Sequence, residues 1–263
     1  MSHAYFTPDR SPRGHIIVLP GIEGESQWNH RIVRGLVGAG LGHSIEIHDW
    51  TYGRWLALYS LRAKSRHRSQ AELIAEKVCE VRQRYPAAPV WLIGHSGGGA
   101  MSVLSLECLP VEVQATGAIL LGPALSRGYD LGPALQATER GIWNFSSICD
   151  ALYLIFGTML MGTLDGRHQP SAGAIGFRRS TPQPTGATIE PANVPPRLTQ
   201  VPWRPRMIRD WHLGGHFGPV SPKFVERWIA PIIEAVPAGD ATTATAAVNA
   251  NAYATPCRQA VPA

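Results

Sequence analysis

The chain has 263 residues, of which 44% are hydrophobic and 16% are charged. This balance supports a packed core and excludes wholesale disorder, and no apolar run reaches the roughly 20 residues that a membrane-spanning helix needs. The formal net charge of +5 is modest, and no basic stripe with interleaved aromatic residues indicates nucleic-acid binding.

The beginning of the chain and its cysteines bear on the cellular setting. No basic start followed by an apolar block is visible, so no signal peptide is expected and a cytoplasmic location is the default expectation. The cysteines stand far apart and include no Cys-x-x-Cys pair, which disfavours a zinc ribbon or a thioredoxin-like site. They are Cys79, Cys108, Cys149 and Cys257.

Short apolar runs alternate with helical patterns along the first part of the chain. Residues 16–19 predict a strand, and a helix with Ser26 as its N-cap follows and ends in a glycine-rich stretch. Residues 44–49 predict the second strand. The next helix is expected to begin at Ser69, because Ser69 and Glu72 have the spacing of a capping box.

The same alternation continues along the rest of the chain. Further strands are expected at residues 90–93, 117–121, 142–145 and 207–208. A helix is expected over 97–109, and a last helix begins with Ser221 as N-cap and Pro222 at its first position. Continuous β-branched runs separated by helices predict an α/β fold, with a mostly parallel sheet of about six or more strands covered by helices on both faces.

One domain is expected over residues 15–236, preceded by an arm of residues 1–14. Within the domain, residues 166–205 are rich in proline and predict a long irregular insertion. Residues 237–263 are mostly Ala, Thr, Pro and Asn and predict a disordered tail. The uncharged segment 151–164 is expected to be a buried helix, with an apolar lid or acyl-chain pocket as the alternative.

The strongest chemical signal is the sequence Gly94-His95-Ser96-Gly97-Gly98, a Gly-x-Ser-x-Gly motif. It follows a predicted strand and opens a predicted helix, so Ser96 falls on a sharp turn where larger neighbours would collide with the strand and the helix. Such a turn exposes the serine hydroxyl at a helix N-terminus, where the dipole favours negative charge. The alternative is a glycine-rich turn that only packs tightly.

With this motif in this context, the chain resembles the α/β-hydrolase superfamily, and in particular its serine esterases and lipases, over nearly all of the predicted domain. The resemblance implies a nucleophile, an acid and a histidine in that order along the chain. His216, in a Gly-Gly-His-Phe sequence shortly before the last helix, matches the histidine. His212 is the alternative, and the glycines between the two histidines disfavour a metal site.

The resemblance places the acid after one of the later strands. Asp150 follows the strand at 142–145 by a short loop, and Asp165 and Asp130 are the alternatives. Either of the first two could instead cap a helix. The two backbone N–H groups of an oxyanion hole are expected at Gly97 and at Ile22, with Gly21 as the alternative to Ile22. Nearby Glu23 could contact substrate or stabilise its loop.

These residues predict a serine hydrolase that cleaves carboxylic esters through an acyl-enzyme, with Ser96 as nucleophile and no metal or cofactor. The substrate class is a small-molecule or lipid-like ester, although a thioesterase, amidase or acyltransferase would use the same residues. The alternative from another class is an inactive scaffold that serves as a binding protein. A basic run at 62–68 predicts a solvated face, with membrane-surface contact as the second interpretation. The oligomeric state leaves no mark on the sequence.

Overall fold

A computed structural model describes residues 8–150, 162–178 and 198–235. The strands are β1 (His15–Leu19), β2 (Ser44–Ile47), β3 (Val90–His95), β4 (Gly117–Leu121), β5 (Ile142–Ser146) and β6 (Leu198–Pro202). The α-helices are α1 (Gln27–Gly38), α2 (Ala57–Arg62), α3 (Lys64–Arg84), α4 (Gly97–Glu107), α5 (Gly132–Gln136), α7 (Ala172–Ile175), α8 (Pro222–Phe224) and α9 (Ala230–Glu234). The tail at 237–263 and most of the apolar segment 151–164 lie outside the described residues.

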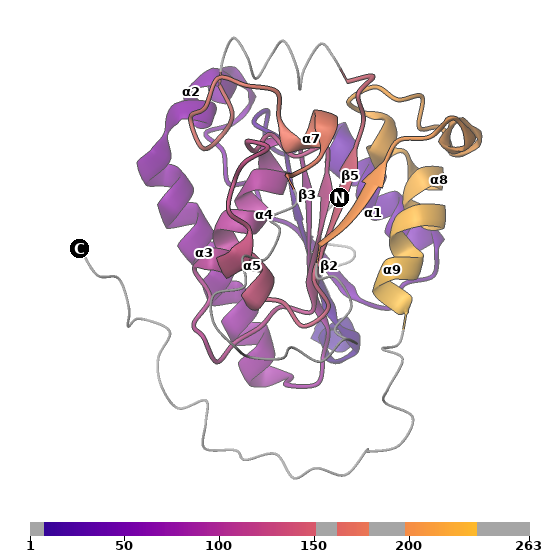
Figure 1. Ribbon diagram of the computed structural model, residues 1–263. Coiled ribbons are helices and arrows are strands. Elements are labelled where there is room, and N and C mark those ends of the chain that lie inside the picture. The colour runs from indigo at the N-terminus through magenta and orange to yellow at the C-terminus, as the bar shows by residue number, and fades with distance from the viewer. Residues whose placement is uncertain (1–7, 151–161, 179–197, 236–263) are drawn as a thin grey trace, which may run out of the picture.

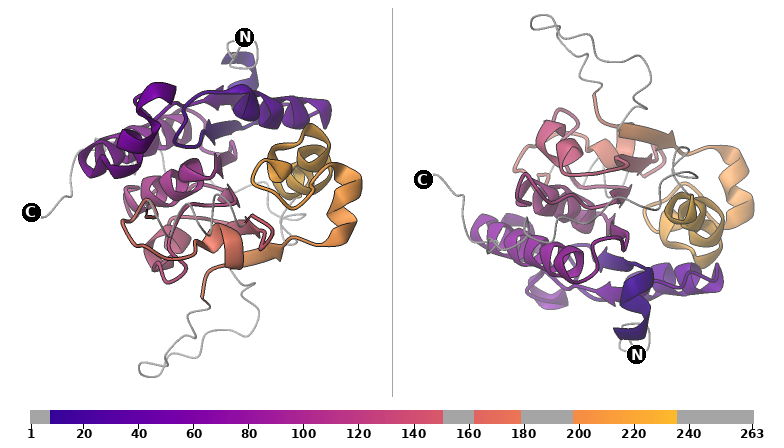
Figure 2. Two further views of the ribbon diagram at one scale, coloured as in Figure 1. Left: turned by 90° about the horizontal axis from the view of Figure 1, so that it is seen from above. Right: turned by 90° about the horizontal axis from the view of Figure 1, so that it is seen from below.

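The six strands form one sheet in the order β2-β1-β3-β4-β5-β6, and every neighbouring pair is parallel. Helices α3, α4 and α5 cover one face of the sheet, and α1, α8 and α9 cover the other (Figures 1 and 2). The predicted fold class, an α/β architecture with helices on both faces of a parallel sheet, is confirmed.

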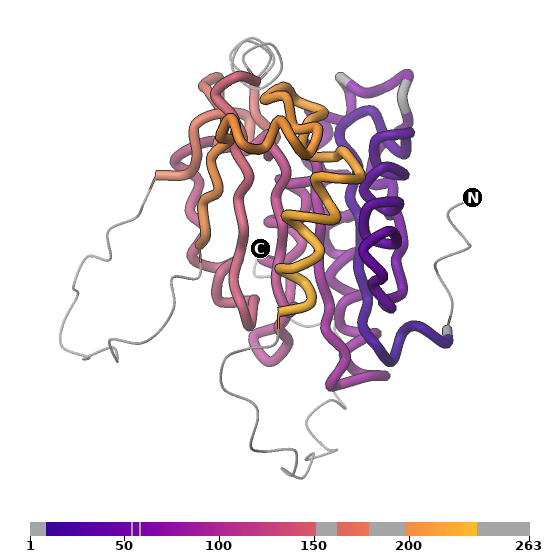
Figure 3. Tube along the Cα trace, turned by 90° about the vertical axis from the view of Figure 1, so that its right-hand side faces the viewer, coloured from indigo at the N-terminus to yellow at the C-terminus, as the bar shows by residue number. Residues whose placement is uncertain are grey.

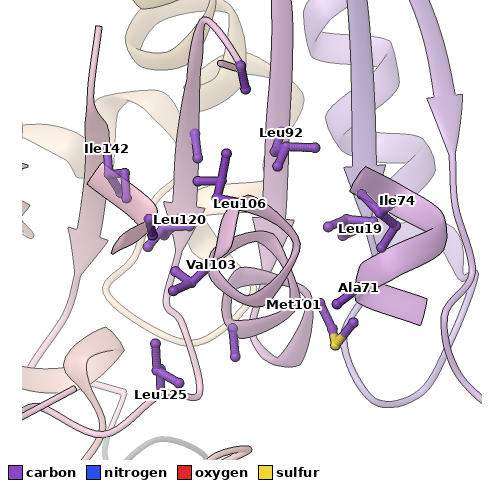
Figure 4. Close-up of a cluster of buried hydrophobic side chains, with 14 of the residues drawn as sticks. Leu19, Ala71, Ile74, Leu92, Met101, Val103, Leu106, Leu120, Leu125 and Ile142 are labelled. Atoms are coloured by element: carbon purple, nitrogen blue, oxygen red, sulfur yellow. The ribbon is translucent and has the colours of Figure 1, made fainter. Parts of the chain in front are cut away.

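The core is divided between the two faces of the sheet because successive side chains of a strand point to opposite sides. Ile17 and Leu19 belong to the cluster under α3 and α4, whereas Ile16 and Val18 belong to the cluster under α1 and α8. All four side chains are fully buried. Figure 4 shows the first cluster, in which strand leucines meet side chains of α3 and α4. Each such aliphatic side chain contributes roughly 1.5–3 kcal/mol by leaving water.

The sheet topology defines where a site can form. Because all strands are parallel, their carboxyl ends meet at one edge, which is the upper edge in Figures 1 and 3. The chain leaves β1 for β2 on one side and later returns to β3 on the other side, so the connections diverge between β1 and β3. Such a divergence opens a crevice beyond the strand ends. Leu19 pairs with Gly94 there, directly before the loops that carry Ile22 and Ser96.

The structure corrects three details of the expected elements. The sixth strand is β6, which lies inside the segment expected to be irregular, and residues 207–208 belong instead to a 3₁₀ helix, Pro205–Asp210. Helix α3 begins at Lys64 rather than at Ser69, whose hydroxyl donates to the carbonyl oxygen of Ser65 at 3.2 Å. The last helix has the expected N-cap and passes through a π-helical turn, Val225–Ile229, before α9.

Candidate active site

Ser96 occupies the sharp turn between β3 and α4. Its backbone has φ 55° and ψ −118°, and only one other non-glycine residue among those described, Trp211, has a positive φ. A side chain held in such a region costs on the order of 1–3 kcal/mol, so the surrounding structure must enforce the conformation. Ser96 is half-buried, unlike His95 before it and Gly97 after it, which are buried.

The flanking glycines allow the turn to pack against its neighbours. A Cβ atom at Gly94 would lie 2.1 Å from the carbonyl oxygen of Gly98, and one at Gly98 would lie 2.1 Å from the carbonyl oxygen of Leu19. Real Cβ atoms do not approach oxygen this closely, so both positions require glycine. The tight strand-to-helix turn that the sequence predicts is therefore present, with Ser96 at its apex.

His216 and Asp150 meet although they are far apart in the chain. The Nδ1 atom of His216 lies 2.5 Å from Oδ2 of Asp150, and the two residues are only 8% and 5% exposed. Two further bonds hold this pair in place. The hydroxyl of Ser147 donates to the carbonyl oxygen of Gly214 at 2.6 Å, which ties the loop of the acid to the loop of the histidine. The amide of Asp150 donates to the carbonyl oxygen of Ser147 at 3.1 Å.

His95 links this pair to the turn that carries Ser96. Its Nε2 lies 3.0 Å from the carbonyl oxygen of His216, and the two imidazole rings are 4.7 Å apart between centroids. Since a carbonyl oxygen only accepts, Nε2 of His95 must carry the proton. Complete burial, reinforced by the nearby His216, lowers the pKa of His95 to about 3, so the ring is neutral at physiological pH. The sequence gives no sign of this role of His95, because its partner is 121 positions away.

The alternative residues have other surroundings. The Nδ1 atom of His212 accepts from the amide of Gly214 at 3.3 Å, and burial lowers the pKa of His212 to about 4. Asp165 accepts from the amide of Ser126 at 3.0 Å. Asp130 accepts from the amide of Gly132 at 2.9 Å. Each of these side chains therefore supports a local turn or loop.

The loop after β1 approaches the start of α4. A Cβ atom at Gly97 would lie 3.4 Å from the backbone nitrogen of Ile22, so these two amides are neighbours. Within the part of the chain that the structure describes, neither amide donates a backbone hydrogen bond. The loop is fixed from the far side by Trp50, whose Nε1 donates to the carbonyl oxygen of Pro20 at 2.8 Å. Two unpaired N–H groups therefore lie beside Ser96.

Glu23 adds a carboxyl group to the same loop. Its Oε1 atom is buried and accepts no hydrogen bond from the described residues. Burial raises the pKa of Glu23, and the neighbouring His216 opposes this shift only in part. The structure thus places Glu23 within electrostatic range of His216, which the sequence could not show.

No group of three or more His, Cys, Asp or Glu side chains in the described ranges is arranged to hold a metal ion. No described helix is both long enough and apolar enough to cross a bilayer.

Sequence comparison finds relatives over part of the chain. A protein of Candida glabrata named "Putative lipase ATG15" is 33% identical over 90 residues, which cover 33% of this chain and 16% of the relative. Its namesake in Saccharomyces cerevisiae is 29% identical over 109 residues, or 40% of this chain and 19% of the relative. The chain thus spans less than a fifth of the length of these curated relatives. No family model matches the chain.

Two solved structures show partial similarity. MGS-M1, an α/β-hydrolase enzyme from a deep-sea metagenome library of the Medee basin, has a TM-score of 0.36 and 17% identity, covering 55% of this chain and 60% of its own. P91, a dienelactone hydrolase-like promiscuous phosphotriesterase from metagenomic libraries, has a TM-score of 0.38 and 16% identity, covering 53% and 59%.

Proposed function

We propose that the protein is a serine hydrolase that cleaves carboxylic esters, with Ser96 as nucleophile, His216 as general base and Asp150 as the acid that orients the histidine. The observation that carries the proposal is the buried contact of 2.5 Å between Asp150 and His216. The backbone of His216 is in turn hydrogen-bonded to His95, the residue directly before the strained turn at Ser96. The partial similarity to proteins named as lipases supports the same reaction class.

In the proposed reaction, His216 takes the proton of the Ser96 hydroxyl as the oxygen attacks the ester carbonyl carbon. Asp150 accepts a hydrogen bond from Nδ1 of the ring, which keeps the ring proton on Nδ1 so that the lone pair of Nε2 takes the proton of Ser96, and the charge of Asp150 stabilises the imidazolium. The N–H groups of Ile22 and Gly97 donate to the developing oxyanion. His216 then protonates the leaving alcohol, and water releases the acid from the acyl-enzyme in a second round.

A fluorophosphonate probe tests the nucleophile directly, because it labels only activated serines. We expect covalent labelling of the intact protein at Ser96, none in Ser96→Ala, and unchanged labelling in Ser105→Ala. Ser105 is a matched control, since it lies on the adjacent helix α4 with a buried hydroxyl that donates to the carbonyl oxygen of Met101 at 2.8 Å. Labelling that persists in Ser96→Ala would assign the nucleophile elsewhere.

A substrate panel separates esterase chemistry from the related reactions. Aryl esters, thioesters and anilides with the same acyl group are compared by kcat/KM, over acyl chains of increasing length. We expect the ester to be the best substrate. A protein that is labelled but turns over only the thioester would be a thioesterase, and one that neither labels nor turns over any substrate would be a binding scaffold.

A further inference from the structure

The exposed large hydrophobic side chains are concentrated at one edge of the molecule. Ten such side chains are exposed among the described residues, and eight of them lie on segments that follow the carboxyl ends of strands. These eight are called the apolar rim: Tyr52, Trp55, Leu56, Tyr59, Ile148, Ile208, Trp211 and Leu213. The other two are Leu73 and Val111. Single exposed apolar residues need no explanation, but a gathering on one edge does.

The apolar rim flanks the candidate active site on two sides. Four of its residues follow β2 and the other four follow β5 or β6, and β2 and β6 are the two outer strands of the sheet. The loops that carry Ile22 and Ser96 follow β1 and β3, between these two groups. In Figure 3, the purple segment around residue 55 and the orange segment around residue 208 both lie at the upper end of the strands. The two groups can therefore face one extended surface at once.

Trp211 is held outward at a conformational cost. It ends the 3₁₀ helix Pro205–Asp210 in the left-handed region, with φ 64°, and its side chain is 66% exposed. A bulky non-glycine residue in this region is strained. Trp55 in the opposite group is 94% exposed. Tryptophan combines a large apolar ring with a polar N–H group, which suits the boundary between lipid and water.

Basic side chains accompany both halves of the apolar rim. Beside Trp211, a cavity of about 410 Å³ is lined by Arg206, Arg209, Asp210, Arg227 and Trp228. The Asp210 carboxylate lies 3.4 Å from the Arg227 guanidinium, so it offsets only one of the three positive charges. On the other side, Arg62 and Lys64 are exposed and form no ion pair within the described residues.

We propose that this edge docks on an anionic phospholipid membrane surface, with the apolar rim entering the interface and the basic residues contacting lipid phosphates. Apolar residues spread over separate loops on both sides of a site fit a planar partner better than they fit a compact protein patch. Their basic neighbours complement an anionic leaflet. The docking does not depend on Ser96 chemistry, so it is tested in the Ser96→Ala protein.

Binding to lipid vesicles tests the proposed membrane docking. Vesicles of phosphatidylcholine alone are compared with vesicles that contain roughly one-third phosphatidylglycerol, by co-sedimentation. We expect binding only to the anionic vesicles, and weaker binding as salt rises from about 0.05 M to about 0.5 M. Because each basic residue near an anionic surface contributes about fivefold, Arg206→Gln with Arg209→Gln should lower the partition coefficient about 30-fold.

Substitutions in the apolar rim test the contribution of its side chains to vesicle binding. Trp211→Asn keeps a residue that tolerates the left-handed backbone, and Leu213→Ser removes a side chain that is 67% exposed. Each should lower binding on the order of tenfold. Matched controls lie at the opposite edge: Val111→Ser removes a side chain that is 95% exposed, and Arg13→Gln with Arg84→Gln removes two exposed charges. These controls should bind as the parent does.

Three outcomes would overturn membrane docking. The first is the absence of binding to anionic vesicles at low salt, and the second is an equal loss of vesicle binding in the rim variants and in the control variants of the opposite edge. The third is binding to soluble polyglutamate that matches vesicle binding and is insensitive to Trp211→Asn, which would indicate an acidic protein partner. If a variant fails to fold, as judged by circular dichroism, brominated lipids keep the test open, because they should quench the tryptophan fluorescence of the parent protein.

Discussion

Replacement of Asp150 by asparagine tests the candidate active site most sharply. The side chain keeps its size but loses its charge beside His216, with which it shares a buried contact of 2.5 Å. An imidazolium and a carboxylate whose charges lie about 4 Å apart interact by about 4 kcal/mol at an effective dielectric constant of about 20. Loss of this interaction in the transition state corresponds to roughly a 10³-fold slower reaction.

A second effect acts in the same direction. The asparagine amide can donate to Nδ1 of His216, which would put the ring proton on Nε2 and remove the lone pair that should take the proton of Ser96. With both effects, we expect kcat for a short-chain aryl ester to fall roughly 10³–10⁴-fold. KM should change little, because Asp150 touches the histidine and is not placed to contact substrate.

The matched control is Asp165→Asn. Asp165 accepts from the amide of Ser126 at 3.0 Å and lies 3.7 Å from the Arg167 guanidinium, so its loss should affect a loop and leave kcat within about threefold. Initial rates are measured on variants whose melting temperatures show that they are folded. A fall of less than tenfold in Asp150→Asn, or a larger fall in Asp165→Asn, would refute the assignment of Asp150 as the acid.

Three further predictions concern the packing and ionisation of the same region. Gly98→Ala would place a Cβ atom 2.1 Å from the carbonyl oxygen of Leu19, so we expect urea titrations to show a loss of about 3 kcal/mol in the free energy of unfolding, together with a loss of esterase activity. Gly128→Ala is the control, because open space surrounds Gly128, and it should leave the free energy of unfolding unchanged. Because the pKa of His95 falls from 6.5 to about 3 on folding, stability should be lost as the pH drops below 6.5, by about 2 kcal/mol at pH 5, and His95→Gln should flatten this slope. Because burial raises the pKa of Glu23, its ionisation opposes folding, so Glu23→Gln should be the more stable protein at pH 8 and lose that advantage below pH 4.5.

The sequence predicts the parts of the fold whose signals are local and strong. Strands β1, β3 and β4 are largely apolar runs that are fully buried, and the local sequence pattern is sufficient to find them. Strand β6 is different: as an outer strand it is only half-buried, and it ends in Pro202, so its sequence lacks a continuous apolar run. The apolar pair at 207–208 has the pattern of a short strand, but it lies in a 3₁₀ helix that begins at Pro205.

Helix α3 shows how a local pattern can mislead. Ser69 and Glu72 have capping-box spacing, yet Ser69 lies inside the helix and its hydroxyl bonds back to the carbonyl oxygen of Ser65. Glu72 pairs instead with Arg68, at 3.0 Å one turn earlier. A helix interior and a helix start can share this spacing, and only tertiary packing distinguishes them.

For the candidate site, the order of residues along the chain predicts which acid and histidine come together, but the sequence does not predict the contacts that hold them in place. Asp150 and His216 could be selected by position relative to strands, and the structure brings these two together rather than Asp165 and His212. The bond from His95 to the carbonyl oxygen of His216 joins segments more than a hundred residues apart and has no local signature. Contacts of this kind depend on the strand order, which single-sequence patterns do not specify.

Several features of this protein that oppose stability are found at one edge. The strained turn at Ser96, the buried Oε1 atom of Glu23 and the outward-facing Trp211 all lie beyond the carboxyl ends of the strands. Among the described residues, the opposite edge contributes only Val111 to the exposed large hydrophobic side chains. Without selection, destabilising features of this kind would be scattered over the surface, whereas selection for a function retains them at the functional site. If stabilising substitutions at Glu23 and Trp211 left both ester turnover and vesicle binding intact, the conclusion that these destabilising features serve a function would be wrong.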